Sequence, residues 1–279
     1  MKKHRTPGSI LDTIITYVIL LVVCAIFFFP CLWLIMASFS KTGSIYSFRG
    51  FFPTGFSGAT FVKLFTDTTM YNYPRWFVNT LFIACMSCII GTFLTILTAY
   101  TMSRFDFKGR KHMMKTTMVL GMFPSFMGMT AVYILMTQFN LINQHWGLIL
   151  IYAAGAPMGY LTQKGFFDTI PKAIDEAAKI DGATNFQIFC KVNLPLSKPM
   201  LVYTALTSFT WPWSDFILPK LLLKEKDLYT VAVGLMSLDE TEFARFAAGS
   251  VFIAVPIVIL YFCLVKNMIH GISAGAVKG

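Results

Sequence analysis

Residues 13–37 read TIITYVILLVVCAIFFFPCLWLIMA, a run without a single charged side chain. A helix that crosses a membrane needs about 20 mostly apolar residues, because the hydrocarbon core is about 30 Å thick. The run is too long for the core of a signal peptide, and no small-residue cleavage site follows it. It therefore predicts a membrane anchor.

Five further apolar segments reach or approach this length. With the first they give six predicted transmembrane helices, at about 13–37, 77–102, 116–137, 146–163, 200–218 and 246–265. The fourth is the weakest, because Pro157 and three glycines interrupt it. Only 13% of the 279 residues are charged, against about 25% in soluble domains. We expect an all-α membrane protein with one transmembrane domain over residues 1–279.

The formal net charge of +10 is distributed unevenly along the chain. If the N-terminus is cytoplasmic, 15 of the 23 Lys and Arg residues lie on the cytoplasmic side, and the outer loops carry six acidic residues. Membrane proteins keep such a basic excess inside, so topology explains the charge better than nucleic-acid binding does. Both termini are therefore expected in the cytoplasm.

Motifs for catalysis or metal binding are not evident in the sequence. Cys85 and Cys88 have a C-x-x-C spacing, but no second pair or nearby His completes a ligand set. The four histidines are far apart, at His4, His112, His145 and His270. No phosphate-binding G-x-x-x-x-G-K-[ST] loop occurs. We expect no catalytic residue, no metal and no cofactor in this chain.

A single ionisable residue, Asp215, falls within a predicted span, near its outer end. Ionisable groups inside the membrane usually mark proton or ion pathways. An interfacial Asp solvated from outside is the favoured interpretation, so the sequence disfavours a proton-driven carrier. It indicates that energy for any transport comes from elsewhere.

The connection over residues 164–198 is the longest cytoplasmic loop. Pro171 suits the first turn of a helix, and Asp168 and Thr169 are candidates for capping it. A short amphipathic helix is expected to follow and to stop or turn at Gly182. A second helical stretch is expected over residues 185–193, ending at Pro195. Such a unit could fill a groove on a partner protein, although an ordinary connection remains open.

The loop also carries a specific pattern: Glu176-Ala177-Ala178, then Asp181-Gly182-Ala183, then Leu194-Pro195-Leu196. This resembles the EAA loop of permease subunits of bacterial ABC importers. Further matches indicate the carbohydrate subgroup typified by the maltose permease MalG. They are Asn79-Thr80-Leu81, Ala99-Tyr100, Ser103-Arg104-Phe105, Phe107-Lys108-Gly109-Arg110, Pro124, Trp213 with Phe216, and Gly275-Ala276-Val277-Lys278-Gly279. The family often has Trp-Asn where this chain has Trp213-Ser214, which leaves the local polar contact uncertain.

The resemblance implies the type I ABC importer permease fold in a bacterial cell membrane. It implies a heteromeric complex with a second, MalF-like permease, an ATPase dimer that uses ATP and Mg²⁺, and an extracellular solute-binding protein. The EAA loop would be a coupling helix seated in the ATPase, through Glu176, Ala177, Ala178, Asp181, Gly182 and Ala183. The C-terminal tail, with Gly275, Lys278 and Gly279, would also contact the ATPase.

The expected function is therefore ATP-driven sugar import, with the chain forming half of the translocation pathway. An oligosaccharide of the maltodextrin type is the favoured cargo. The aromatic residues are too numerous for the sequence to single out the side chains that contact the sugar. Two other classes stay open: a membrane-embedded transferase and a proton-driven secondary carrier.

Overall fold

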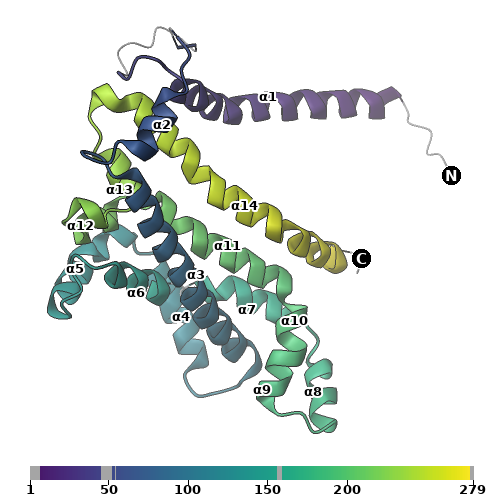
Figure 1. Cartoon of the computed structure of the whole chain (residues 1–279). Coiled ribbons are helices and arrows are strands. Elements are labelled where there is room, and N and C mark those ends of the chain that lie inside the picture. Colours follow the sequence, from purple (N-terminus) through teal and green to yellow (C-terminus); the bar gives the residue numbers. More distant parts are fainter. Residues whose placement is uncertain (1–6, 45–51, 54, 156–158, 277–279) are drawn as a thin grey trace. The chain divides into compact units, whose positions relative to one another are not determined.

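The computed structural model describes residues 7–44, 52–53, 55–155 and 159–276, and it is nearly all helical (Figure 1). The chain divides into two compact units. Unit 1 comprises Met1–Met70 with Leu238–Phe252, and unit 2 comprises Tyr71–Ser237 with Ile253–Gly279. The last helix, α14 (Phe243–Ala276), contributes its first turns to unit 1 and the remainder to unit 2.

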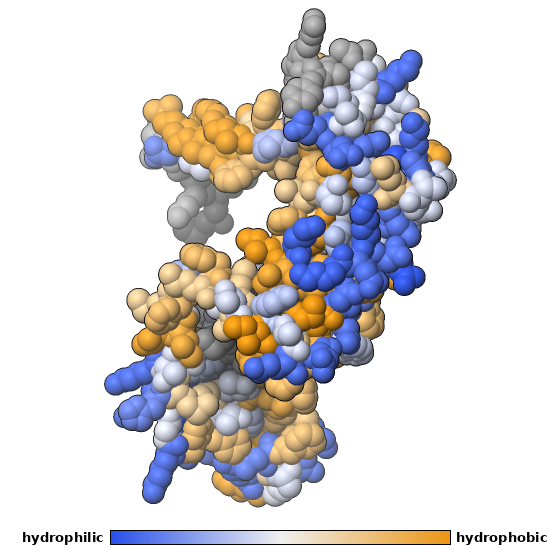
Figure 2. All heavy atoms as spheres, turned by 90° about the vertical axis from the view of Figure 1, so that its left-hand side faces the viewer, coloured by the Kyte–Doolittle hydropathy of each residue, from blue (hydrophilic) through white to orange (hydrophobic). Residues whose placement is uncertain are grey.

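Helix α1 (Pro7–Ser38) of unit 1 is apolar and exposed along most of its length. The most apolar window of its stretch Leu11–Ser38 is not buried against the chain at all. Leu21 and Phe27, for example, are 70% and 73% exposed. Figure 2 shows apolar side chains over wide areas of the molecular surface. Apolar surface of this extent requires lipid or another subunit to cover it.

The remainder of unit 1 is held together by a charged cluster and by aromatic contacts. Arg245 lies 2.9 Å from Asp67 and 3.1 Å from Glu242. The hydrogen bond from Arg245 is the largest cause that lowers the pKa of Asp67. Phe252 packs edge-on against Phe65, with ring centroids 5.0 Å apart. These contacts join α14 to α2 (Ala59–Thr66), a helix between the first two predicted spans.

Unit 2 is built around α3 (Tyr73–Arg104), whose most apolar window is 39% buried. Asn72 caps its N-terminus by accepting a hydrogen bond from Arg75 N (3.3 Å). In the described part of the chain, four α-helices make the most extensive contacts with α3. They are α6 (His145–Gly155), α7 (Tyr160–Thr169), α11 (Lys198–Ser214) and α13 (Val231–Met236).

The first turns of α3 bind the segment that leads into α13. Trp76 Nε1 donates to Lys226 O (2.8 Å), and Asn79 Nδ2 donates to Asp227 O (2.7 Å). Thr80 Oγ1 accepts from Val231 N (2.8 Å). The Asn-Thr pair of the sequence pattern therefore satisfies backbone groups about 150 residues away that would otherwise be buried without partners.

Gly234 in α13 lies against the indole of Trp76, and a Cβ atom placed there would be 2.1 Å from the ring. We expect Gly234→Ala to destabilise unit 2 by about 1–3 kcal/mol, because the buried Trp76 cannot move without losing its contacts. The thermal midpoint of the purified protein measures this. Gly165→Ala in α7, where a Cβ meets nothing within 4 Å, is the matched control. Equal midpoints for the two variants would contradict the close contact.

In the described part of the chain, three helices are long and apolar enough to cross a membrane: Leu11–Ser38, Tyr73–Arg104 and Glu240–Lys266. They coincide with the first, second and sixth predicted spans. A bent pair, α4 (Arg110–Gly121) with η2 (Ser125–Gly128) and α5 (Met129–Gln138), becomes a fourth if it counts as one span.

The other predicted spans are not continuous helices. The third breaks before Pro124, which is extended (φ −58°, ψ 127°), because proline disfavours the helical conformation of the residue before it. The fourth corresponds to α6 and α7, with residues 156–158 outside the described part, and α7 continues to Thr169 instead of ending at residue 163. The fifth ends at Ser214, and α12 (Ile217–Leu222) follows.

Asp215 explains the break in the fifth span. Its Oδ1 accepts a hydrogen bond from Leu218 N (3.3 Å) at the start of α12, and its Oδ2 accepts from the Tyr152 hydroxyl (2.8 Å). The expectation of an Asp that is simply solvated from outside was therefore incomplete. Its carboxylate is half-buried and joins three helices.

Candidate functional site

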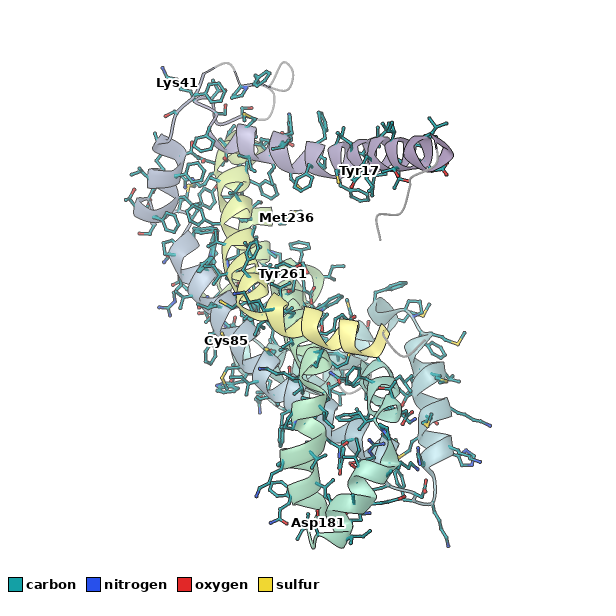
Figure 3. The ribbon with its side chains drawn as sticks, turned by 90° about the vertical axis from the view of Figure 1, so that its right-hand side faces the viewer. Tyr17, Lys41, Cys85, Asp181, Met236 and Tyr261 are labelled. Atoms are coloured by element: carbon teal, nitrogen blue, oxygen red, sulfur yellow. The ribbon has the colours of Figure 1, made fainter. Side chains whose placement is uncertain are left out.

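The predicted coupling segment forms two antiparallel helical pieces joined by a tight turn. Helix α8 (Lys172–Ile180) precedes the turn and α9 (Asn185–Ile188) follows it; we call residues 172–188 the α8–α9 hairpin. Figure 3 shows Asp181 at its tip. The capping prediction was wrong, because Asp168 and Thr169 lie in the last turn of α7 and Pro171 occupies the N-cap of α8.

Gly182 makes the turn, as the sequence predicted. Its φ is +82°, a left-handed conformation that residues with a Cβ rarely adopt. Gly182 N donates to Lys179 O (3.0 Å) and Ala183 N donates to Ala178 O (2.9 Å). These two bonds form a Schellman motif, which satisfies the last carbonyl groups of α8 and fixes where the chain leaves it.

The second helical piece begins with a capping box. Thr184 Oγ1 accepts from Gln187 N (3.2 Å), and Gln187 Oε1 accepts from Thr184 N (2.8 Å). The piece does not end at Pro195 as expected. It widens into π-helical turns in η4 (Phe189–Asn193) and continues through α10 (Leu194–Leu196), where Pro195 lies in the first turn and needs no N–H.

The surface of the hairpin is unusually apolar for a solvated loop. Ile180 and Phe186 flank the turn and are 86% and 74% exposed. Of the predicted docking residues, four are exposed and two are half-buried: Glu176, Ala177, Asp181 and Gly182 in the first group, Ala178 and Ala183 in the second. The charged side chains beside this apolar tip are of both signs, since Lys179 and Asp181 flank Ile180 and both are exposed.

The buried side of α8, by contrast, carries a charge that the sequence analysis missed. Asp175 lies opposite Arg104, the last residue of α3, with Oδ2 2.8 Å from the guanidinium Nε. Their side chains are 11% and 6% exposed. Asn193 donates to Asp175 Oδ1 (2.8 Å), and Arg104 donates to Asn193 Oδ1 (3.2 Å) and Ile170 O (3.0 Å). This Arg104–Asp175–Asn193 network ties both halves of the coupling segment to α3.

Two further contacts support the base of the hairpin. Asp168 receives a hydrogen bond from Ser103 (2.6 Å) and pairs with Lys164 (2.5 Å). Tyr100 packs against Phe167 and Phe189, with ring centroids 5.7 Å and 4.7 Å away. The Ala-Tyr and Ser-Arg-Phe elements of the sequence pattern thus belong to one packed junction between α3, α7 and η4.

The remaining predicted site residues lie at the C-terminus. Gly275 is in the last turn of α14, while Lys278 and Gly279 lie outside the described residues. Among the described residues there is no group of three or more His, Cys, Asp or Glu side chains that could hold a metal ion.

Known proteins resemble this chain over nearly its whole length. Residues 91–278 match the family of binding-protein-dependent transport system inner membrane components. The maltodextrin permease protein MalD of Streptococcus pneumoniae is 37% identical over 95% of both chains. The galactooligosaccharide permease protein GanQ of Bacillus subtilis is 36% identical, again over 95% of both. The maltose/maltodextrin permease protein MalG of Vibrio parahaemolyticus is 34% identical over 73% of this chain and 72% of its own.

The fold is also that of a solved transporter chain. A chain from the crystal structure of a bacterial ABC transporter that imports the acidic polysaccharide alginate superimposes with a TM-score of 0.77, covering 95% of this chain and 99% of its own at 19% identity. The relatives are transport subunits, which removes support for the transferase and the proton-driven carrier. The protein is therefore a membrane-embedded permease subunit that belongs to the family of binding-protein-dependent transport system inner membrane components.

Proposed function

We propose that the chain is one of two permease subunits of an ATP-driven importer and that its α8–α9 hairpin docks into a separate ATPase. The observation that carries this proposal is the exposed apolar tip of Ile180 and Phe186 beside the acidic Glu176 and Asp181. The buried network of Arg104 then provides the rigid connection through which a displacement of the hairpin reaches α3.

The proposed cargo is an oligosaccharide of the maltodextrin type. Relatives that are 34–37% identical are named for maltodextrin or maltose transport, and GanQ for galactooligosaccharides. We propose an extracellular solute-binding protein and a second, MalF-like permease as partners, in keeping with the family description. We further propose that the chain itself holds no cofactor and that ATP and Mg²⁺ bind the ATPase dimer.

We propose six spans in a bacterial plasma or inner membrane, with both termini cytoplasmic and one permease domain over residues 1–279. The spans would be α1, α3, α4 with α5, α6 with α7, α11 with α12, and α14. The charge distribution supports this orientation, because the connection that contains the hairpin is rich in lysine and basic loops are favoured on the cytoplasmic side. The C-terminal residues Gly275, Lys278 and Gly279 would then lie on the side of the ATPase.

Reconstitution tests this function directly. The chain is purified together with the second permease and the ATPase, placed in liposomes, and supplied with binding protein loaded with maltotriose or with a galactooligosaccharide. We expect sugar-loaded binding protein to stimulate ATP hydrolysis and sugar uptake. A chain that purifies without any ATPase subunit, or a complex that no sugar-loaded binding protein stimulates, contradicts the proposal.

Glu176 allows a charge test of the docking surface. We expect Glu176→Lys to lower uptake about tenfold, equivalent to about 1.4 kcal/mol of docking energy, because it reverses a charge that faces the ATPase. Asp227→Lys is the matched control, since this exposed acid lies at the opposite end of α3. Uptake and the amount of co-purified ATPase are measured for both. Equal values for the two variants would exclude Glu176 from the docking surface.

A further inference from the structure

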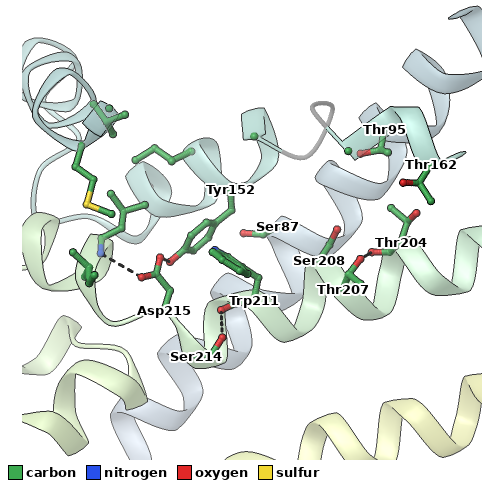
Figure 4. A pocket seen from close by; sticks show the side chains of 18 of the residues that line it. Ser87, Thr95, Tyr152, Thr162, Thr204, Thr207, Ser208, Trp211, Ser214 and Asp215 are labelled. Carbon is green, nitrogen blue, oxygen red and sulfur yellow. Dashed lines mark hydrogen bonds between the residues drawn. The ribbon is translucent and has the colours of Figure 1, made fainter. Parts of the chain in front are cut away.

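Unit 2 contains a cavity of about 990 Å³ between α3, α5, α6, α7, α11 and α12 (Figure 4). Small-molecule sites usually occupy about 300–1,000 Å³, so this cavity has space for more than one sugar ring. No residue of the α8–α9 hairpin lines the cavity, and the nearest lining residue before it in the chain is Gln163 of α7. It is therefore a site distinct from the docking surface.

One face of α11 supplies a row of hydroxyl groups to this cavity. The row contains four Ser and Thr residues, Thr204, Thr207, Ser208 and Ser214. Together with Trp211 they recur at intervals of three or four residues, so all five share one face of the helix. Figure 4 shows the side chains of Thr204, Thr207, Ser208 and Trp211 on the same side of α11. Thr207 and Ser214 donate their hydroxyl protons to carbonyl groups of their own helix, Tyr203 O (3.0 Å) and Trp211 O (3.1 Å), so towards a ligand these oxygens serve as hydrogen-bond acceptors.

Trp211 provides an aromatic surface in the same row. Its side chain is 60% exposed, and that of Tyr203, which also lines the cavity, is 44% exposed. In contrast, the neighbouring Trp213 is 1% exposed and packs between Phe77 and Phe209. Sugars present C–H groups on one face of the ring and hydroxyls around its edge, which fits an exposed indole beside hydroxyl groups.

Three buried polar atoms in the lining lack partners within the described chain. They are Ser87 Oγ, Thr95 Oγ1 and Gln163 Oε1. The amide nitrogen of Gln163, by contrast, donates to Met200 O (2.6 Å) and to Thr204 Oγ1. These atoms are covered by the protein and lie behind the cavity surface, so the direct contacts with a ligand are assigned to the exposed groups of α11 instead.

The charge of the lining defines the class of sugar. Among the described residues that line the cavity there is no Lys, Arg or His, and Asp215 is the one acidic residue. The Asp215 carboxylate already accepts hydrogen bonds from Tyr152 and Leu218 N. A carboxylated sugar would therefore meet a negative charge and no compensating positive one.

We propose that this cavity binds a neutral oligosaccharide during its passage through the membrane, with Trp211 as the stacking surface and the hydroxyl row of α11 as hydrogen-bond partners. The inference rests on the proposed function as a sugar permease and deepens it. It assigns sugar contacts to this chain itself, in addition to any made by the second permease.

The test uses the full complex in liposomes, with binding protein saturated with radiolabelled maltotriose. For Trp211→Leu we expect the sugar imported per ATP hydrolysed to fall about tenfold. The amounts of ATPase and second permease that co-purify with Trp211→Leu stay at the wild-type level, because the docking surface is intact. Trp146→Leu is the matched control: Trp146 is 48% exposed and does not line the cavity. We expect it to behave as wild type.

Three results would overturn the sugar site while leaving the proposed function standing. The first is a normal ratio of sugar to ATP in Trp211→Leu. The second is loss of the second permease from the purified variant, which would make the row a subunit contact. The third is that the wild-type complex imports a uronate oligosaccharide as fast as it imports maltotriose. A wild-type complex that imports no sugar would overturn the proposed function and this site together.

Discussion

The Gly182→Val variant is expected to reach the membrane in normal amounts but to import sugar at less than about a tenth of the wild-type rate. A β-branched residue at a φ of +82° costs about 1–3 kcal/mol, and each 1.4 kcal/mol changes an equilibrium tenfold. No atom lies within 4 Å of the added Cβ, so the cost arises from the backbone and not from a clash. The Schellman turn therefore shifts, and the exposed tip beside it loses its fit to the proposed ATPase partner.

The measurement is sugar uptake together with ATP hydrolysis stimulated by the loaded binding protein, and both should fall. Gly182→Asn should retain most activity, because Asn tolerates the left-handed conformation. Gly109→Val is the matched control, since Gly109 also has a positive φ (+95°) and empty surroundings. Normal uptake by Gly182→Val, or equal losses in Gly182→Val and Gly109→Val, would show that the turn has no special role in coupling.

The sequence predicts the long helices well and the interrupted ones poorly. The span predicted at 13–37 corresponds to the apolar stretch Leu11–Ser38, because an unbroken apolar run leaves little choice of structure. The span predicted at 200–218 fails at Asp215, whose hydrogen bond from Leu218 N is local but whose contact with Tyr152, 63 residues away in the sequence, depends on tertiary packing. Hydropathy alone detects neither interaction.

The same distinction applies to the coupling segment. The turn at Gly182 is predictable because a local backbone requirement selects glycine. The network behind it is not, because Arg104 and Asn193 are 89 residues apart and nothing in the pattern pairs them with Asp175. The apolar residues of α8 signalled an amphipathic helix, but the buried contact is made by a charge and Ile180 points outward. In α8 a charged side chain is therefore buried and apolar side chains are exposed, which is the reverse of the usual distribution.

The buried ion pair makes Arg104 a position where a substitution should strongly destabilise the protein. We expect Arg104→Met to lower stability by about 3–5 kcal/mol, because it leaves the Asp175 carboxylate buried without a counter-ion. Asn193 and Ile170 O also lose a donor. Thermal unfolding of the purified complex and proteolysis within residues 170–193 measure the loss, and uptake should fall with it.

Arg110→Met is the matched control, because Arg110 pairs with Asp106, whose side chain is 86% exposed, and such surface pairs contribute only about 0.2–1 kcal/mol. If Arg104→Met and Arg110→Met were equally stable, the buried network would not hold the hairpin.

The double variant Arg104→Met/Asp175→Leu removes both charges and should regain much of the stability. We expect uptake to recover only partly, because apolar side chains cannot replace the directional bonds to Asn193 and Ile170 O that fix the hairpin relative to α3. Full recovery of uptake would instead show that the network contributes to stability and not to coupling.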